Sequence, residues 1–73
     1  MTESWREFAS VLRQLRVERG WSQEQLAERA ELNRSYLGQV ERGRAIPSLI
    51  TLNKLATALE IRLSSIISRC EHH

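Results

Sequence analysis

The sequence is poor in the residues that build catalytic and metal centres. Its 73 residues include one cysteine, Cys70, two terminal histidines, His72 and His73, and no aspartate. A single cysteine can form neither an internal disulfide nor a zinc site by itself, and this usage fits a reducing compartment. The histidine pair is typical of an expression-tag remnant, and the chain has no glycine-rich phosphate loop. We therefore expect no enzyme, no bound metal and no cofactor.

Long apolar runs are missing as well. No stretch approaches the roughly 18 apolar residues that cross a bilayer, and the N-terminus lacks the basic-then-apolar pattern of a signal peptide. This predicts a cytoplasmic protein with no membrane contact. One proline, three glycines and the lack of repeats or linkers leave no division of the chain, so residues 1–73 are expected to form one domain.

What the chain does have is arginine. Ten of its eleven basic residues are Arg, with Lys54 as the exception, although the net charge is only +2. The planar guanidinium suits phosphates and guanine edges better than a lysine ammonium does. A domain this small buries only about 60% of its unfolded surface, which leaves little chain to enclose a substrate. A binding module is therefore favoured over a catalyst.

Apolar residues recur at steps of three and four, which predicts five short helices. Period-two alternation is missing throughout, so no strand is expected and the fold class is all-α. The expected helices cover residues 4–19, 22–30, 33–42, 48–59 and 63–69.

Capping signals support these boundaries. Four expected helix starts carry a short polar side chain that can accept a backbone hydrogen bond: Ser4, Ser22, Asn33 and Ser48. Glu7 and Gln25 complete possible capping boxes at the first and second helices. Gly20 and Gly43 fall where helices should stop.

The expected core is aliphatic with aromatic edges. Apolar positions of the first and fourth helices are Trp5, Phe8, Leu12, Leu15, Leu49, Leu52, Leu55, Ala56 and Leu59. Trp5, Phe8 and Trp21 are interpreted as core or core-edge residues and not as stacking platforms for bases. Arg13, Arg19 and Arg29 receive no specific role.

The second and third helices are joined by only Glu31 to Asn33. So short a connection forces a steep crossing, which is the geometry of a DNA-reading helix-turn-helix over about residues 23–42. Ala27 is small where the two backbones would come closest. The apolar residues expected to seal this pair against the rest of the domain are Leu26, Ala30, Leu32, Leu37 and Val40.

The segment QEQLAERAELNRSYLGQVERG, Gln23 to Gly43, resembles the lambda-repressor/Cro-type (XRE-like) helix-turn-helix family. The resemblance extends through Leu12–Ser22 upstream and Pro47–Ile61 downstream. Within the family, NRSYLGQVERG is most similar to the small controller proteins of restriction–modification systems. The resemblance implies a five-helix lambda-repressor-like domain that regulates transcription by binding double-stranded DNA, as a repressor or an activator.

The same resemblance implies base-reading positions at the start of the third helix. They are Arg34 and Ser35, with Gln39 one turn further on. Arginine suits a bidentate contact to guanine and glutamine one to adenine. Gly38 is explained either by close approach of the helix to the bases or by tight helix packing.

Other positions are assigned to the phosphate backbone or to the scaffold. The expected backbone contacts are Gln23, Asn33, Tyr36, Arg42, Arg44 and Ser48. Tyr36 has an alternative role, packing half-buried against the second helix. The resemblance also implies an internal ion pair between Arg16 and Glu41. Glu31 and Glu60 stand where glycine is usual, and a left-handed backbone there costs about 1–2 kcal/mol.

The C-terminal apolar residues exceed what one short final helix can hide. An exposed apolar patch with a polar rim marks an interface. We therefore expect a homodimer through residues 61–69, which implies a palindromic operator. The alternative is that these residues close the core of the monomer. The expected interface residues are Ile61, Leu63, Ile66 and Ile67.

A second function remains open at this point. The same domain serves as an antitoxin in toxin–antitoxin pairs, where the main partner is a protein and the antitoxin also binds its own promoter. The chain shows no extra segment to wrap a toxin, which disfavours that role, and a neighbouring toxin gene would favour it. No sensor domain is apparent, so no small-molecule effector is expected.

Overall fold

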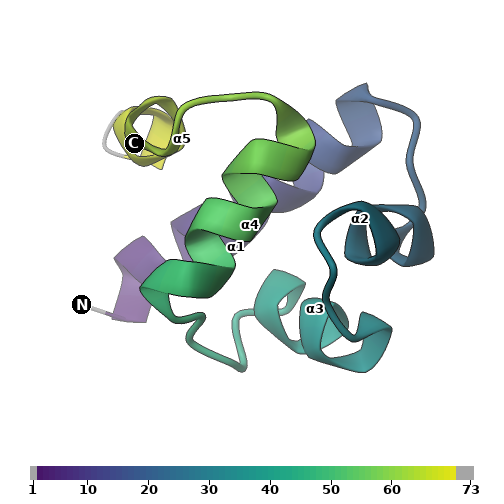
Figure 1. Ribbon diagram of the computed structural model, residues 1–73. Coiled ribbons are helices and arrows are strands. Elements are labelled where there is room, and N and C mark those ends of the chain that lie inside the picture. The colour runs from purple at the N-terminus through teal and green to yellow at the C-terminus, as the bar shows by residue number, and fades with distance from the viewer. Residues whose placement is uncertain (1, 71–73) are drawn as a thin grey trace.

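The protein is described by a computed structural model that covers the backbone of residues 2–70 and the side chains of residues 6–70. Over this range the chain forms five helices and no strand, as predicted (Figure 1). The helices are α1 (Thr2–Glu18), α2 (Gln23–Arg29), α3 (Arg34–Glu41), α4 (Leu49–Leu59) and α5 (Leu63–Cys70).

The predicted start of the first helix is wrong. α1 begins at Thr2, so Ser4 lies inside the helix and is not its N-cap. The expected core residue Trp5 lies outside the described side chains, and His72 and His73 lie outside the described residues.

The other three predicted N-caps are confirmed. The Ser22 hydroxyl accepts from the backbone N–H of Gln25, whose side chain accepts from the Ser22 N–H to complete a capping box. The Asn33 side chain caps α3, and the Ser48 hydroxyl accepts from the Thr51 N–H at 3.1 Å. Each such cap is worth about 1 kcal/mol, so these residues fix where α2, α3 and α4 begin.

Left-handed residues end the helices where the glycine pattern predicted. Gly20 and Gly43 have φ of +72° and +73°. Glu31 and Glu60, at the family's usual glycine positions, have φ of +57° and +55°. The two glutamates therefore adopt the left-handed turn in spite of their side chains.

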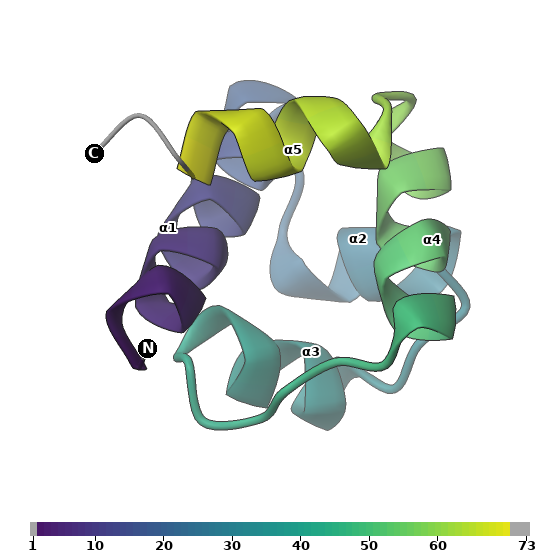
Figure 2. The same cartoon turned by 90° about the vertical axis from the view of Figure 1, so that its left-hand side faces the viewer.

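The core is built of aliphatic side chains from all five helices. α1 packs against α3 and α5, and α2 packs against α3 and α4. Figures 1 and 2 place α3 and α5 at opposite ends of the molecule, with α1 and α4 between them. The largest fully buried side chains are Leu12, Leu15, Leu26, Leu37, Val40, Leu55, Leu59 and Ile66.

One predicted core residue of α4 is on the surface. Leu49 is 66% exposed, whereas Leu55 is fully buried. The six steps from Leu49 to Leu55 turn the helix by about 600°, which rotates Leu49 about 120° off the buried stripe. It lies beside Ile46 and Ile50 in the chain, and these are exposed as well. In the described part of the chain no helix is both long and apolar enough to pass through a membrane.

Candidate nucleic-acid interface

α2 and α3 pack directly on each other through the expected apolar residues. Ala27, predicted to lie where the two backbones come closest, is 2% exposed. The turn closes where the Leu32 N–H donates to the Ala27 carbonyl at 2.8 Å, immediately after the left-handed Glu31. The helix-turn-helix predicted for residues 23–42 therefore lies at α2 (Gln23–Arg29) and α3 (Arg34–Glu41).

α3 has one buried side and one exposed side. Leu37 and Val40 are buried in the core. The three residues predicted to read bases, Arg34, Ser35 and Gln39, are all exposed. The helix thus presents a polar face to solvent while its apolar face anchors it to the domain.

The exposed arginines around this face have no internal acceptor. Among the described residues, no hydrogen bond or ion pair engages the guanidinium of Arg34, Arg42 or Arg44. α3 carries no acid in its first turn, and its last residue, Glu41, is 6% exposed and faces the interior. The surface therefore combines uncompensated positive charge with free donors, which suits an anionic partner.

The first turn of α3 is held by Asn33. Its side-chain carbonyl accepts from the Ser35 N–H at 2.8 Å and from the Tyr36 N–H at 3.3 Å. Only the amide N–H₂ of Asn33 is left for a phosphate. Tyr36 is half-buried and packs against the core, as its alternative role predicted.

The ion pair implied for Arg16 and Glu41 is present. Arg16 Nε donates to Glu41 Oε2 at 2.8 Å, and Arg16 Nη2 donates to Oε1 at 3.1 Å. Arg16 Nη1 also donates to the Trp21 carbonyl at 2.8 Å. Gln23 Nε2 donates to the same Glu41 Oε1 at 3.0 Å, so one amide hydrogen of this predicted phosphate contact is engaged internally. The other amide hydrogen remains available.

The loop after α3 is tied back to the helix. The backbone N–H groups of Arg44 and Ala45 both donate to the Gln39 carbonyl, at 2.9 and 3.3 Å. Arg44 and Ser48 are exposed on this loop, and the Ser48 hydroxyl is occupied by Thr51. Of these two predicted phosphate contacts, Arg44 has the freer side chain.

The four predicted interface residues separate into three environments. Ile66 is 1% exposed and belongs to the core of its own chain, because it lies on the inner side of α5. Ile61 and Leu63 are half-buried against the core, and Ile67 is 42% exposed. Ile66 is therefore placed inside the domain, and Ile67 offers the most apolar surface of the four.

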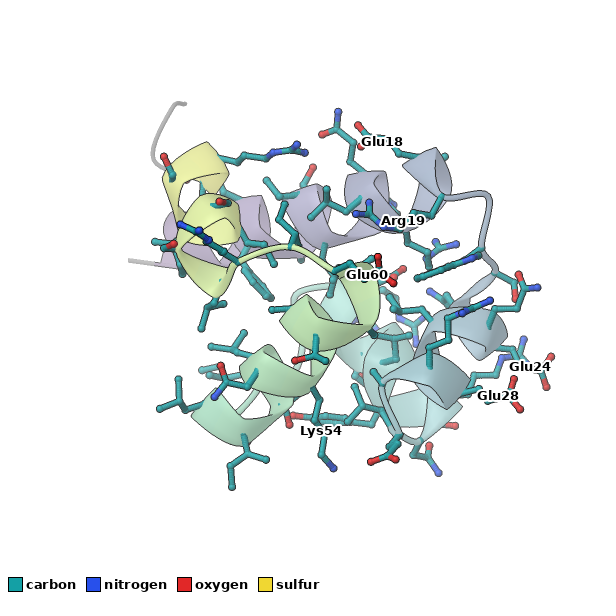
Figure 3. All side chains as sticks on the ribbon, turned by 45° about the horizontal axis from the view of Figure 1, so that its top comes forward. Glu18, Arg19, Glu24, Glu28, Lys54 and Glu60 are labelled. Carbon is teal, nitrogen blue, oxygen red and sulfur yellow. The ribbon has the colours of Figure 1, made fainter. Side chains whose placement is uncertain are left out.

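Two arginines have structural contacts that the sequence analysis missed. Arg19, at the end of α1, donates to the Leu15 carbonyl and to the Leu59 carbonyl in the last turn of α4. Figure 3 shows Arg19 beside Glu60, where α4 ends. The guanidinium of Arg29 lies 4.3 Å from the centre of a Trp21 ring. The sequence offered one signal for the contact of Arg29 with Trp21, which is that the two residues lie eight positions apart near the two ends of the expected second helix.

A surface patch was also missed. Ile46 in the loop before α4 is 78% exposed, and Leu49 and Ile50 in the first turn of α4 are 66% and 70% exposed. The signal was in the sequence for Ile50, because it lies off the apolar stripe that Leu52, Leu55 and Leu59 form, whereas Ile46 lies before the helix.

The comparisons with known proteins agree with this geometry. The restriction-modification controller protein C.AhdI from Aeromonas hydrophila superposes with a TM-score of 0.80 and is 48% identical, over 82% of this chain and 91% of that one. The control protein C.MunI from Mycoplasma sp is 37% identical over 88% of both chains. The HTH-type transcriptional regulator SutR of Escherichia coli K12 is 43% identical over 84% of this chain, which spans only 34% of SutR.

The family profile described as helix-turn-helix matches residues 12–66, which is most of the chain. This range contains the whole of α2, α3 and α4, together with the C-terminal part of α1 and the start of α5. The resemblance drawn from Gln23–Gly43 is confirmed, and its likeness to controller proteins is shared by C.AhdI and C.MunI. The chain therefore belongs to the helix-turn-helix family of the XRE-like (HTH_3) type.

Proposed function

We propose that the protein is a transcriptional regulator that binds a palindromic DNA operator as a homodimer. The observation that carries this proposal is the exposed face of α3, where no hydrogen bond among the described residues engages the side chains of Arg34, Ser35 and Gln39 on a helix anchored by the core. The names of the relatives support it, since they include a transcriptional regulator and two controller proteins. Control of a restriction–modification system is the narrower function that we propose.

The chemistry of the face suits the major groove. The N-terminal residues of such a helix approach base edges, and Arg34 can donate two hydrogen bonds to guanine O6 and N7. Gln39 can pair with adenine N6 and N7, while the Ser35 hydroxyl can serve either as donor or acceptor. These contacts give sequence preference, because only base edges distinguish one operator from another.

Phosphate contacts are proposed around this face. Arg44 has a free guanidinium in the loop after α3, and Gln23 retains one amide hydrogen at the start of α2. Contacts of this kind set register and salt dependence without choosing a sequence.

Binding selection from a random DNA pool, followed by anisotropy titrations on the selected operator and on a scrambled duplex, tests the proposal. Arg34→Ala is expected to weaken operator binding by about 5- to 150-fold and to relax preference at one base pair. Arg44→Ala is the matched comparison, since it removes the same charge from a neighbouring site. It should weaken both duplexes by a similar factor and make the salt dependence shallower by about one unit of slope.

Two results would contradict the proposal. If the selected pool shows no consensus, the protein is not a sequence reader. If Arg34→Ala lowers binding to the operator and the scrambled duplex equally, Arg34 contacts phosphate and the assignment of base reading to α3 loses its main residue.

The homodimer is proposed through α5. Figures 1 and 2 place α5 at the opposite end of the domain from α3, so a partner on α5 leaves the DNA-facing helix uncovered. To read two half-sites of one palindrome, the dimer would have to present its two α3 helices about 34 Å apart, one turn of the duplex. Ile67, 42% exposed on α5, is the side chain best placed to enter the contact.

Sedimentation across a concentration series tests the dimer. Ile67→Ser should shift the equilibrium toward monomer, whereas Val17→Ser, at a 61%-exposed apolar position on α1, is the matched control and should not. A wild-type protein that stays monomeric at high micromolar concentration, with and without operator, contradicts the proposed dimer.

A further inference from the structure

Gly38 is a buried glycine of α3 beside the exposed polar face, and a side chain covers it. A Cβ built at Gly38 would lie 3.3 Å from Arg42 Nη2, 3.5 Å from Nη1 and 3.7 Å from Cζ. The guanidinium of Arg42 therefore lies flat against the helix where a side chain would otherwise be. Glycine inside a helix costs about 1 kcal/mol relative to alanine, so its presence here needs a structural or functional reason.

Helix geometry places this guanidinium among the predicted base readers. Residues four apart lie on the same side of a helix, so Arg34, Gly38 and Arg42 form one row. A helical side chain leans toward the N-terminus, which brings the Arg42 guanidinium back by one turn to the level of Gly38. Ser35 and Gln39 lie on one side of this row and the buried Leu37 and Glu41 on the other, so the Arg42 guanidinium borders the polar face at the level of Gly38.

The Arg42 side chain has no competing structural role. Among the described residues no hydrogen bond or ion pair engages it, whereas the guanidinium groups of Arg16 and Arg19 are bonded within the fold. Its planar fork of donors is therefore free, and it lies beside the helix over Gly38, where no side chain competes for the space. A side chain that already lies where a complex needs it loses less entropy on binding.

We propose that Arg42 is a specificity-determining residue that reads a base edge, with guanine as the best match to its fork, and that Gly38 positions it. This inference rests on the DNA-binding function proposed above. It replaces the phosphate contact that the family resemblance implied for Arg42. A side chain directed outward to a phosphate would leave Gly38 uncovered, in contrast to the observed contact.

A double-mutant cycle tests both parts. Wild type, Gly38→Ala, Arg42→Ala and the double variant are titrated with the selected operator and with a scrambled duplex. Arg42→Ala should weaken operator binding by about 5- to 150-fold, with a clearly smaller loss on the scrambled duplex. Gly38→Ala should weaken operator binding when Arg42 is present, because the new methyl would lie 3.3 Å from Arg42 Nη2 and the guanidinium would have to shift, and should change little when residue 42 is alanine.

Two further variants separate charge and folding from recognition. Arg42→Lys keeps the positive charge but not the planar fork of donors. Compared with Arg42→Ala, it should regain the affinity for the scrambled duplex without regaining the base preference. Arg13→Ala removes an arginine from an exposed position on α1 and should leave both affinities unchanged. Alanine is the better helix former, so Gly38→Ala should not lower the melting temperature, and lost binding cannot then be attributed to unfolding.

The opposite results overturn the inference. Equal losses on both duplexes for Arg42→Ala would make Arg42 a phosphate contact. An equal effect of Gly38→Ala with and without Arg42 would mean that the glycine acts by letting the helix backbone approach the bases. A wild type that selects no operator would instead contradict the proposed function, so the two failures are distinguishable.

Discussion

The guanidinium of Arg16 on α1 makes two parallel hydrogen bonds to the carboxylate of Glu41 at the end of α3, across 25 positions of sequence. The two side chains are 13% and 1% exposed. Gln23 at the start of α2 donates to the same carboxylate, so Glu41 joins three helices through one side chain. This group fixes the C-terminal end of α3 relative to α1 and α2, and with it the orientation of the surface proposed to bind DNA.

Loss of this carboxylate charge should destabilise the domain. Glu41→Gln leaves the Arg16 cation without its anion in a mostly buried site, and breaking a buried pair in this way costs about 3–5 kcal/mol. Because Arg16 keeps some solvent access, we expect a loss near the lower end, about 3 kcal/mol, in urea unfolding.

Glu18→Gln is the control for that experiment. It makes the same chemical change at an exposed position of α1 and should alter the free energy of unfolding by less than about 0.5 kcal/mol. Equal effects of the two substitutions would mean that the Arg16–Glu41 contact contributes nothing to stability.

Glu60 offers the opposite change, a gain in stability. Its φ of +55° places a non-glycine residue in the left-handed region, at the C-cap of α4. Glu60→Gly should stabilise the domain by about 1 kcal/mol, the strain removed less the extra freedom that glycine has in the unfolded chain. Thermal unfolding measures this as a rise in melting temperature.

Alanine at the same position separates two causes. An acid at a helix C-terminus is disfavoured by the helix dipole, so Glu60→Ala relieves that effect while keeping the left-handed strain. We expect alanine to stabilise less than glycine. If alanine matches glycine, the carboxylate and not the backbone is what destabilises this turn.

Local features of the fold were predictable because they depend on neighbouring residues. Ser22, Asn33 and Ser48 cap helices through bonds to residues two or three positions away, and the left-handed Gly20 and Gly43 end helices by their own backbone freedom. Periodicity predicted the helices but misplaced Leu49, since a residue in the first turn can look periodic while lying off the buried stripe.

Contacts between distant segments were not predictable from pattern. The Arg16–Glu41 pair was expected only through the family resemblance, and Arg19 with the Leu59 carbonyl was not expected at all, because 40 positions of sequence separate them. The contact of Arg42 with Gly38 needed the observed side-chain position, since helical spacing alone also permits an extended arginine. Ile66 was assigned to an interface because the C-terminal apolar residues outnumber what one short helix can hide, whereas α5 places its side chain in the core.

The two leucines of α4 provide a matched pair for a final prediction. Leu55 is fully buried and Leu49 is 66% exposed, on the same helix. Leu55→Ala should cost about 2–5 kcal/mol, because it removes apolar contacts and leaves a cavity, whereas Leu49→Ala should cost less than about 0.5 kcal/mol. Urea unfolding at low micromolar concentration measures both, and similar losses would contradict the placement of Leu49 on the surface. Repeating the Leu49→Ala measurement at high protein concentration adds a second test. If the dimer contact lies on α5, the small loss in free energy of unfolding should be the same at both concentrations. A loss that grows with protein concentration would place the start of α4 in the dimer interface.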